Sequence, residues 1–456
     1  MQIPKHIFKK YDIRGLVDSE ITPKIAESIG RAYATLRQSE LPGKELTVTV
    51  GRDMRSSSIE YESSLIKGLT ESGVNVVKIG LISTPAFYFS VGYLNADGGI
   101  MVSASHNPSQ YNGFKMTRDR AIPVSGDSGI QEIASLIEQE QFVSSDKVGI
   151  VSEVVNIPEQ SARSEFEFAG NHPVKKMKIV VDSSNGMGAQ YMDHLFSFVD
   201  EDVTRLFWDF DGTFPNHEAD PFKPENLVSL QKKVLELNAD LGICTDGDGD
   251  RIFFVDNEGE IVEPSIIRGI LAQIMLRQYP GSVICYDIRP GKITEDLILE
   301  SGGKPSVTRV GHSLIKEQMR SEDAVFGGES SGHFFYKFPM GTFEGPVTVA
   351  TQILQEISQQ NKSFSEIIRP LKRYFHSGEI NFRVEDVSAS IEKIKLTYAD
   401  GTLLVLDGVS ISYPTFWFNV RGSNTEPVLR LNLEAISKDI MEQKRDELVI
   451  LLKENK

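Results

Sequence analysis

The feature that most restricts the fold of this chain is a series of segments in which apolar strands alternate with amphipathic helices. Strands as apolar as these are usually buried on both faces, as in a parallel sheet. The pattern occurs three times before about residue 365, so the sequence predicts α/β units in series. The predicted elements are strands at 46–51, 74–80 and 98–104 with a helix at 57–72, strands at 177–182 and 239–245, and strands at 281–288 and 305–310 with a helix at 347–359.

Beyond about residue 365 the pattern changes. Short strands of alternating polarity precede a single amphipathic helix, which is typical of a smaller α+β domain. A polar stretch at 144–154 is a candidate linker between the first two units. The predicted elements of the last part are strands at 379–384, 402–406, 417–421 and 428–435 and a helix at 439–453.

Composition and charge exclude several classes of protein. The 456 residues carry a net charge of −16, whereas nucleic-acid-binding domains usually carry a basic stripe. The chain has two cysteines, Cys244 and Cys285, which excludes a disulfide framework and suits a reducing compartment. The N-terminal segment lacks the apolar run of a signal peptide, and no window reaches the ~18 apolar residues of a membrane span. We therefore expect a cytoplasmic protein without nucleic-acid or membrane partners, and the sequence leaves its oligomeric state open.

The strongest chemical signal is the segment T-D-G-D-G-D-R. Asp246, Asp248 and Asp250 place three carboxylates close together, where they would repel one another unless a cation held them. The glycines between them let the backbone curl toward one centre, and carboxylate oxygens suit Mg²⁺ or Ca²⁺. An EF-hand loop does not fit, because Arg251 and Asn257 stand where it needs Gly and Glu. The alternative is an acidic turn without a metal.

A second signal is S-A-S-H-N-P at the end of the predicted strand 98–104. In open α/β sheets, ligands bind at the carboxyl ends of strands. Ser105 lies at such an end, with His106 and Lys115 close to it in the sequence. Asn-Pro is also a common turn dipeptide, so a strand-ending turn without chemistry is the alternative.

Two polar loops follow later in the chain. In G-G-E-S-S-G-H, the side chains of Glu329, Ser331 and His333 alternate, so an extended segment would point all three the same way. In R-G-S-N-T-E-P, Arg421 is followed by two hydroxyls and an amide, a suitable set of donors for a phosphate. Each segment also fits an ordinary polar turn.

Several arginines stand at predicted strand ends. Arg14 in Y-D-I-R-G could face a ligand, and Arg251 beside the acidic triplet could bind a phosphoryl oxygen with two hydrogen bonds. Arg52 and Arg55 in G-R-D-M-R-S are more typical of structural ion pairs or helix starts.

Taken together, the motifs resemble those of the α-D-phosphohexomutase superfamily, most closely its bacterial phosphomannomutase/phosphoglucomutase branch. Y-D-I-R-G, S-H-N-P, D-G-D-G-D-R, G-H-S-L-I-K, G-E-S-S-G-H and S-N-T-E-P occur in family order over essentially the whole chain. The resemblance implies an α/β fold class: three related α/β domains with mixed sheets, and a smaller C-terminal α+β domain, around a central cleft. The expected domains are 1–150 with a phosphoserine loop, 151–256 with a metal-binding loop, 257–366 with a sugar-binding loop, and 367–456 with a phosphate-binding loop.

The resemblance also implies an activity. A phosphohexose mutase interconverts hexose 6-phosphate and hexose 1-phosphate, here of mannose and/or glucose, through a phosphoserine and a 1,6-bisphosphate intermediate. The expected cofactor is Mg²⁺, with hexose 1,6-bisphosphate as activator, and the expected partners are small-molecule sugar phosphates.

The same resemblance assigns roles to individual residues. Ser105 is the expected phosphoserine and ligates Mg²⁺ together with Asp246, Asp248 and Asp250. Lys115 or His312 is the expected general base. The residues expected around the transferring group are Arg14, His106, Lys115, Arg251 and His312. The residues expected to bind the substrate are Glu329, Ser331 and His333 at the sugar, Arg289 where many relatives have Lys, and Arg421, Ser423, Asn424 and Thr425 at its other phosphate.

Three other functions compete with this interpretation. Phosphoglucosamine mutases usually have Gly at the position of Asn424 and Gln at that of Ser330, and both differences argue against an amino sugar. The segment D-F-D-G-T resembles the haloacid-dehalogenase phosphotransferases, with Asp209 as nucleophile and Asp211 as general acid. The prolines that follow would break the helix or flap that those enzymes need. An inactive, sugar-phosphate-binding relative is the third alternative, which the intact Ser105 and acidic triplet argue against.

Overall fold

The computed structural model describes residues 3–170, 172–289, 291–422 and 428–453. Contacts divide the chain into two compact units. The first unit comprises Met1–Val262 and Gly332–Phe364, and the second comprises Glu263–Ser331 and Ser365–Lys456.

The N-terminal sheet of the first unit is mixed. Its strand order is β1-β5-β4-β2-β3-β6, with β2 parallel to both of its neighbours, β6 parallel to β3, and β5 antiparallel to β4 and β1. The polar stretch 144–154 is therefore only partly a linker, because it contains β6. The strands are β1 (Ile13–Leu16), β2 (Thr47–Arg52), β3 (Asn75–Leu81), β4 (Gly98–Val102), β5 (Tyr111–Arg118) and β6 (Val151–Glu153).

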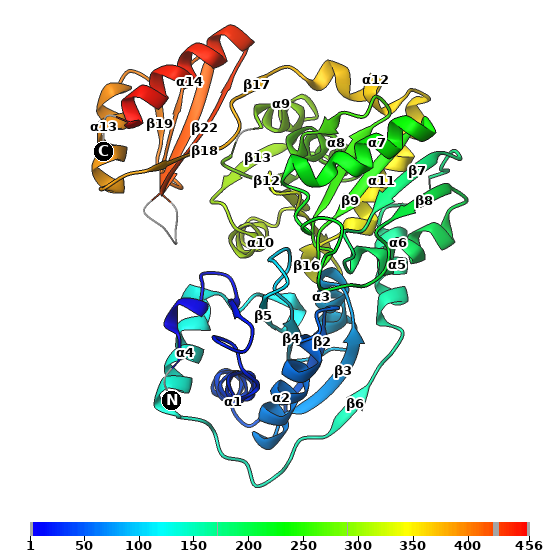
Figure 1. The fold of residues 1–456 in the computed structure, drawn as a ribbon, viewed down its shortest axis with the longest axis vertical. Coiled ribbons are helices and arrows are strands. Elements are labelled where there is room, and N and C mark those ends of the chain that lie inside the picture. Colours follow the sequence, from blue (N-terminus) through cyan, green and yellow to red (C-terminus); the bar gives the residue numbers. More distant parts are fainter. Residues whose placement is uncertain (1–2, 171, 290, 423–427, 454–456) are drawn as a thin grey trace. The chain divides into compact units, whose positions relative to one another are not determined.

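Helices cover both faces of this sheet (Figure 1). Val50 of β2 shares a buried core with Ile29 and Leu65 from the first two helices. Gly99 faces the other side, where an added Cβ would lie 2.7 Å from Phe87 of the third helix. The helices are α1 (Pro23–Glu40), which begins after the capping residue Thr22, α2 (Ser58–Glu71), α3 (Thr84–Tyr93), which begins after the capping residue Ser83, and α4 (Ile130–Gln139).

A second mixed sheet follows in the same unit, with strand order β11-β10-β9-β7-β8. Strands β8 and β9 run parallel to β7, and β10 runs antiparallel to β9. The loop between β9 and β10 therefore connects two fully buried strands. The elements are α5 (Ile157–Phe168), β7 (Lys178–Asp182), α6 (Gly188–Phe198), β8 (Asp202–Leu206), α7 (Val228–Leu237), β9 (Leu241–Thr245), β10 (Ile252–Asp256) and β11 (Ile261–Val262).

The end of the first unit is a hairpin followed by a long buried helix. Glu165 of α5 accepts hydrogen bonds from the amides of Val347 and Thr348, so it caps the N-terminus of that helix. The hairpin consists of β15 (Phe334–Phe338) and β16 (Gly341–Glu344), and the helix is α11 (Pro346–Gln360).

The second unit begins with a parallel arrangement in which β12 pairs with both β13 and β14. The helix that follows β12 starts directly after the segment D-I-R-P-G. The elements are α8 (Pro264–Gln278), β12 (Val283–Asp287), α9 (Lys292–Glu300), β13 (Lys304–Thr308), α10 (His312–Ser321) and β14 (Phe326–Gly328).

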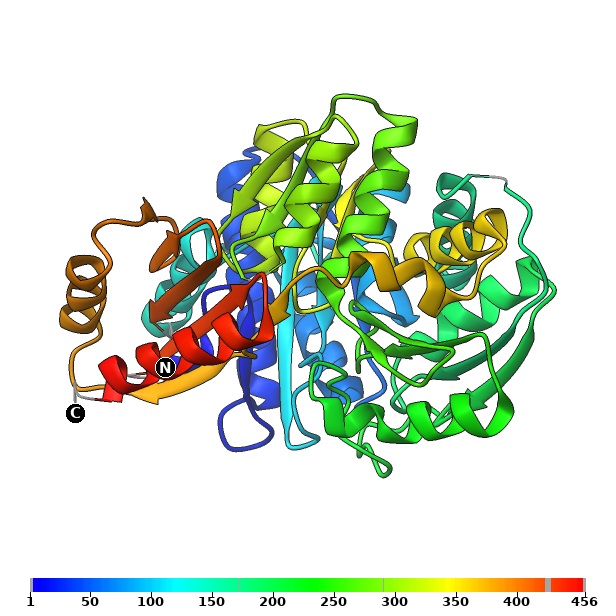
Figure 2. The same ribbon diagram turned by 90° about the horizontal axis from the view of Figure 1, so that it is seen from above.

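The C-terminal part of the second unit has an antiparallel sheet of order β17-β22-β21-β20-β19, with β18 also paired to β22. The last helix lies along this sheet in Figure 2, and its Leu448 and Leu452 share a core with Leu431 and Leu433. The elements are β17 (Phe375–His376), β18 (Ile380–Arg383), α13 (Val387–Thr397), β19 (Thr402–Leu404), β20 (Val409–Ser412), β21 (Phe416–Gly422), β22 (Val428–Ala435) and α14 (Lys438–Lys453).

The predicted fold class is confirmed: the chain is a mixed α/β protein with mixed sheets and an antiparallel C-terminal sheet. Both cysteines are buried, Cys244 on β9 and Cys285 on β12, and neither forms a disulfide. Among the described residues, no helix combines the length and the apolarity needed to span a membrane.

Candidate active site

The acidic triplet lies in the loop between β9 and β10. One carboxylate oxygen from each of Asp246, Asp248 and Asp250 lies within 4.8 Å of the others, and all three residues are buried. The two intervening glycines are required here. Gly249 has a φ of +75°, and a Cβ on Gly247 would lie 2.6 Å from the carbonyl oxygen of Ser105. The loop therefore brings three buried charges together beside Ser105.

Two side chains from the N-terminal sheet region bind this triplet. Lys115 of β5 donates hydrogen bonds of 2.6 Å to both Asp248 and Asp250, and the Thr84 hydroxyl donates one of 2.5 Å to Asp248. Burial alone would lower the pKa of Lys115, but the two carboxylates raise that pKa well above its usual value.

The carboxylates themselves titrate differently. Burial raises the pKa of Asp246 well above its usual value, and the charges of Asp250 and Asp248 raise it further. Burial acts in the same direction on Asp250, but Lys115 and His333 outweigh it, so the pKa of Asp250 lies well below its usual value.

The triplet meets the requirements of a divalent-cation site. Asp248 Oδ1 is buried and has no hydrogen-bond partner among the described residues, although a buried carboxylate oxygen normally has one. The nearby donors are hard oxygens from three carboxylates and from Ser105. This donor set fits Mg²⁺ or another hard cation.

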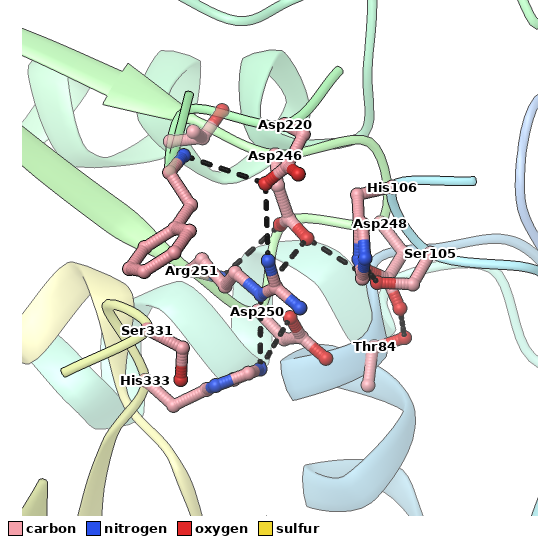
Figure 3. A network of polar contacts seen from close by, with 12 residues as sticks. Thr84, Ser105, His106, Asp220, Asp246, Asp248, Asp250, Arg251, Ser331 and His333 are labelled. Carbon is pink, nitrogen blue, oxygen red and sulfur yellow. Dashed lines mark hydrogen bonds and ion pairs between the residues drawn. The ribbon is translucent and has the colours of Figure 1, made fainter. Parts of the chain in front are cut away.

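Ser105 lies next to the triplet in a strained backbone conformation. Its φ is +54°, in the left-handed region that is unfavourable for a residue with a side chain. The hydroxyl lies 3.3 Å from Asp246 Oδ2 and 3.2 Å from His106 Nδ1, and the Ser105 amide donates to the Ser103 hydroxyl at 2.9 Å. Figure 3 shows Ser105 and His106 on the same side of the acidic loop.

Cations surround this centre. Arg14 pairs with Asp12 at 2.7 Å and donates to Asn107 at 2.6 Å, directly beside the Ser105 loop. Arg14 and Arg251 both act on His106. Burial lowers the pKa of His106 well below its usual value, and these two positive charges lower it further, so the imidazole is neutral at neutral pH.

Arg251 and His333 contact each other beside the acidic triplet. His333 Nε2 lies 3.1 Å from Asp250 Oδ1 and 3.4 Å from Arg251 Nε (Figure 3). The Arg251 guanidinium also donates to Asp220 at 3.1 Å. The structure thus brings seven predicted residues together in the first unit, around Asp246: Ser105, His106, Lys115, Arg14, Asp248, Asp250 and Arg251, with His333 as an eighth.

Two residues that bind this centre, Thr84 and Asp220, were not predicted from the sequence. Thr84 follows β3 in a G-L-I-S-T-P stretch without any chemical motif, and only the fold places it against Asp248. Asp220 lies in the segment P-N-H-E-A-D-P, where no spacing indicates that its carboxylate would bind Arg251.

A second group of predicted residues lies in the second unit. Glu329 accepts a 2.8 Å hydrogen bond from the amide of Gly311, the residue that precedes His312 and α10. Arg289 Nη2 lies 3.4 Å from the Ser331 hydroxyl and 3.7 Å from Glu329 Oε1. The predicted residues Glu329, Ser331 and Arg289 therefore form one cluster.

Arg289 is fixed within that cluster by its own strand. Its Nε donates to Asp287 at 2.5 Å, and the buried Arg268 donates to the other oxygen of the same carboxylate at 2.6 Å. Burial alone would lower the pKa of Arg289, but Asp287 and Glu329 raise that pKa above its usual value. Arg289 is therefore a permanent, oriented cation.

The predicted extended geometry of G-G-E-S-S-G-H is wrong. The chain turns at 330–332, and Gly332 has a φ of +88°. The alternation of side chains is lost at such a turn, because Gly adopts a backbone conformation that a strand does not. Glu329 and His333 accordingly have separate partners, the Gly311 amide and Asp250.

Arg421 lies at the end of β21, directly opposite Arg430 of β22. Glu379 joins the two, accepting from Arg421 Nη2 at 2.6 Å and lying 3.5 Å from Arg430 Nη1. Burial alone would raise the pKa of Glu379, but Arg421 and Arg430 lower it below its usual value. The predicted phosphate ligands Ser423, Asn424 and Thr425 lie outside the described residues.

The haloacid-dehalogenase interpretation does not fit the structure. Asp209 is exposed, and Asp211 accepts hydrogen bonds from the amide and hydroxyl of Thr213, which closes an ordinary turn. Within the described part of the chain, the acidic triplet is the only group of three or more His, Cys, Asp or Glu residues arranged to hold a metal.

Comparison with known proteins agrees with this geometry. Models of phosphoglucomutase/phosphomannomutase match consecutive segments: alpha/beta/alpha domain I at 5–144, domain II at 160–259, domain III at 263–374 and the C-terminal domain at 379–451. The chain belongs to the phosphoglucomutase/phosphomannomutase family.

Individual relatives cover the chain almost completely. A phosphomannomutase of Vibrio cholerae is 37% identical over 98% of both chains, and a phosphomannomutase/phosphoglucomutase of Pseudomonas aeruginosa is 36% identical over 97% of this chain and 94% of its own. The crystal structure of a phosphoglucomutase/phosphomannomutase family protein from Burkholderia thailandensis has a TM-score of 0.89 at 31% identity, covering 100% of this chain and 98% of the other. The buried acidic triplet beside Ser105 therefore lies in a chain that matches all four phosphoglucomutase/phosphomannomutase domain models.

Proposed function

We propose that this chain is a phosphohexose mutase that interconverts hexose 6-phosphate and hexose 1-phosphate, of mannose and/or glucose, through a phosphoserine at Ser105. The observation that carries the proposal is the position of Ser105: its backbone is strained, and its hydroxyl lies beside three buried carboxylates and several cations. Family membership and the full-length likeness to proteins named phosphomannomutase and phosphoglucomutase support it.

We assign the metal to the acidic triplet. Asp246, Asp248 and Asp250 would hold Mg²⁺ together with an oxygen at Ser105, and the unpartnered Oδ1 of Asp248 is a ready ligand. When bound, Mg²⁺ neutralises charge on the phosphoryl group that is transferred.

The side chains of this protein then position the reacting groups and neutralise their charge, which is most of what phosphoryl transfer requires. The hydroxyl oxygen of the bound sugar monophosphate attacks the phosphorus on Ser105, and the bond from phosphorus to the Ser105 oxygen breaks. The sugar hydroxyl loses its proton and becomes a phosphate ester, so the product is a 1,6-bisphosphate. After that molecule turns end for end, Ser105 takes back the other phosphoryl group. Arg14 and Arg251 are placed to stabilise the charge that develops.

The proton acceptor is Lys115 or His312. In the arrangement that the structure shows, Lys115 is protonated, because its ammonium group donates to both Asp248 and Asp250. Lys115 can therefore accept a proton only after it has left these carboxylates, and His312, the first residue of α10, is the alternative acceptor. His106, neutral and 3.2 Å from the Ser105 hydroxyl, is suited to orient the nucleophile.

We assign sugar recognition to Glu329 and Ser331 with Arg289, and to His333. The non-reacting phosphate is assigned to Arg421 with Ser423, Asn424 and Thr425. We also propose the four domains 1–150, 151–256, 257–366 and 367–456, a cytoplasmic location, and a hexose 1,6-bisphosphate that activates by phosphorylating Ser105.

The test is a coupled assay with mannose 1-phosphate, glucose 1-phosphate and glucosamine 1-phosphate in the presence of Mg²⁺, combined with mapping of the phosphate by mass spectrometry. We expect turnover of mannose and glucose phosphates with kcat/KM values within about 200-fold of each other, because the proposed sugar ligands contact hydroxyls that both sugars share. The phosphate should be on Ser105. A preference for glucosamine 1-phosphate, or phosphate on Asp209, would overturn the proposal.

A further inference from the structure

The side chain of Arg55 is bound to the backbone of the loop that carries Ser105. Its guanidinium donates to four carbonyl oxygens: to Ser105 at 2.9 Å, Asn107 at 2.6 Å and Pro108 at 2.9 Å in that loop, and to Tyr111 at 3.1 Å at the start of β5. Arg55 is 1% exposed. It therefore joins three carbonyls of the loop between β4 and β5 to the first residue of β5.

These bonds matter because the loop cannot obtain them from a sheet. Among the described residues, the carbonyls of Ser105 and Asn107 accept no backbone hydrogen bond, and a buried carbonyl without a partner costs about 1–3 kcal/mol. A guanidinium carries five N–H donors in a fixed planar fork, so one side chain can hold several carbonyls in a fixed relative geometry. Ser105 lies in the same loop with its φ of +54°, and such a conformation persists only where the surroundings determine it.

Arg55 is itself held by Asp53. The Asp53 carboxylate accepts from Arg55 Nε at 3.2 Å, from the Arg55 amide at 3.1 Å and from the Ser58 hydroxyl at 2.6 Å. Asp53, Arg55 and Ser58 are all buried, so Arg55 is anchored in the turn that precedes α2. The predicted structural ion pair of Arg55 is present, and it supports the phosphoserine loop.

The segment that resembled a haloacid-dehalogenase motif covers the other side of Arg55. The Phe214 ring lies 5.0 Å from the guanidinium carbon, within range of a cation–π interaction. Gly212 approaches the Arg55 backbone so closely that a Cβ on it would lie 2.6 Å from Arg55 Cα. The turn closed by Asp211 and Thr213 therefore delivers Phe214, with a φ of +52°, onto the arginine.

We propose that Arg55 is a positioning residue of the phosphoryl transfer: it fixes the carbonyls around Ser105 so that the nucleophile keeps its place beside Asp246, and Phe214 keeps Arg55 in place. This inference rests on the proposed mutase function. Gly247 supports the geometry from the opposite side, because it leaves just enough room for the Ser105 carbonyl that Arg55 binds.

The test compares Arg55→Met and Arg55→Lys with Arg52→Met. Arg52 is the matched control, since it lies in the same segment but contacts the Asp53 carbonyl and Glu62, not the Ser105 loop. We expect Arg55→Met to lower kcat by about 100-fold, the cost of a displacement of about 1 Å in a reacting group. KM should change by less than about 3-fold, because the hydrogen bonds of Arg55 hold the nucleophile's loop and not a residue assigned to the sugar. Arg55→Lys keeps the charge with fewer, differently placed donors and should recover part of the loss.

Two measurements separate positioning from general stability. Mg²⁺ affinity and melting temperature are measured for each variant, and hydrogen exchange is followed in a peptide covering 103–112. In Arg55→Met we expect exchange in this peptide to increase over the wild-type rate by more than it does in α2 and β4, and Mg²⁺ binding to be retained through the three carboxylates. If Arg55→Met does not fold, Arg55→Lys and Phe214→Leu decide the question by the same measurements, with Phe214→Leu expected to lower kcat by about 3- to 10-fold.

The proposal is wrong if folded Arg55 variants have the same kcat as Arg52→Met, or if exchange in 103–112 is unchanged. These outcomes are distinct from failure of the proposed function. A wild-type protein inactive on all three sugar phosphates would refute the mutase, whereas the exchange measurement still decides whether Arg55 holds the loop.

Discussion

The Ser105 centre and the Arg421 pair both handle phosphate in our proposal, but they are built in opposite ways. At Ser105 the three carboxylates are at most 4% exposed and are joined to Lys115, Thr84 and His333. At Arg421, two arginines stand directly opposite on β21 and β22 and share the single carboxylate of Glu379.

The two regions differ in how many of their charged groups already have a partner within the protein. Like charges directly opposite on neighbouring strands are destabilising, and Glu379 offsets this for only one charge. The Nε atoms of Arg421 and Arg430 are buried and have no hydrogen-bond partner among the described residues. The Ser105 centre is therefore preorganised for a fixed reaction, whereas the arginine pair has an excess positive charge that an incoming phosphate can neutralise.

The largest effect is expected at the nucleophile. Ser105→Ala removes the phosphate acceptor, so we expect kcat to fall by about 10⁴-fold or more, as for the loss of other catalytic nucleophiles. The melting temperature should stay within a few degrees of wild type. Ser109→Ala, an exposed serine in the same loop, is the control and should keep its activity. Substantial turnover by Ser105→Ala would place the phosphoryl acceptor elsewhere.

The second largest effect on turnover is expected at the acidic triplet. We expect excess chelator to abolish turnover and added Mg²⁺ to restore it. Asp248→Asn should weaken Mg²⁺ binding and lower kcat by about 10²- to 10³-fold, because one charged ligand is lost from the site. Calorimetric titration with Mg²⁺ and steady-state rates measure both. Asp209→Asn is the control: it is exposed, outside the triplet, and should behave as wild type. Full activity in chelator would refute the metal assignment.

The arginine pair should show a smaller effect, and one that leaves the first centre intact. Arg421→Ala should lower kcat/KM by about 10- to 100-fold in both directions, since a hydrogen bond to a charged group is worth about 1.5–3 kcal/mol. Phosphorylation of Ser105 and Mg²⁺ affinity should not change. Arg430 is 37% exposed and lies 3.5 Å from Glu379, so Arg430→Ala should cost less than about 5-fold. Loss of metal binding in Arg421→Ala would contradict the assignment of different functions to the two regions.

The smallest effect on activity is expected at Glu165, which caps α11 and has no role in the proposed chemistry. Burial raises its pKa to about 8, although two backbone amides oppose the shift. The folded state therefore holds a proton that the unfolded chain releases near pH 4.5, so this group's stabilisation is present below pH 4.5 and is lost as pH rises to about 8. Between pH 4.5 and about 8, the free energy of unfolding should therefore fall less in Glu165→Gln than in the wild type, by at most about 5 kcal/mol. Denaturant unfolding at pH 5 and pH 8 measures it; identical pH dependence in both proteins would contradict it.

Much of the fold could be predicted from the sequence because apolar periodicity and turn residues determine it locally. The strand predicted at 46–51 is β2 (Thr47–Arg52), and the helix predicted at 439–453 is α14 (Lys438–Lys453). Strand β6 was missed because it is exposed and polar, and it pairs only at the edge of its sheet. No alternation of polarity marks such a strand.

The site, like the fold, has parts that local sequence predicts and parts that it does not. The carboxylates of T-D-G-D-G-D-R are adjacent in sequence, so their convergence could be predicted, and the structure shows it. Thr84, Asp220 and Arg55 act through contacts over 31 to 164 positions of sequence, which no local pattern reports. The turn at Gly332 was mispredicted because alternation of residue types alone does not distinguish a strand from a turn.

The burial of both cysteines has a practical consequence. Burial raises the pKa of the Cys285 thiol to about 12 and that of Cys244 well above its usual value, so neither supplies the thiolate that alkylating dyes require. A cysteine introduced at an exposed position would consequently be modified alone. The wild-type sequence can thus serve directly as the background for fluorophore or spin labels, one in each unit, and distances between the labels can be followed during turnover without first removing native thiols.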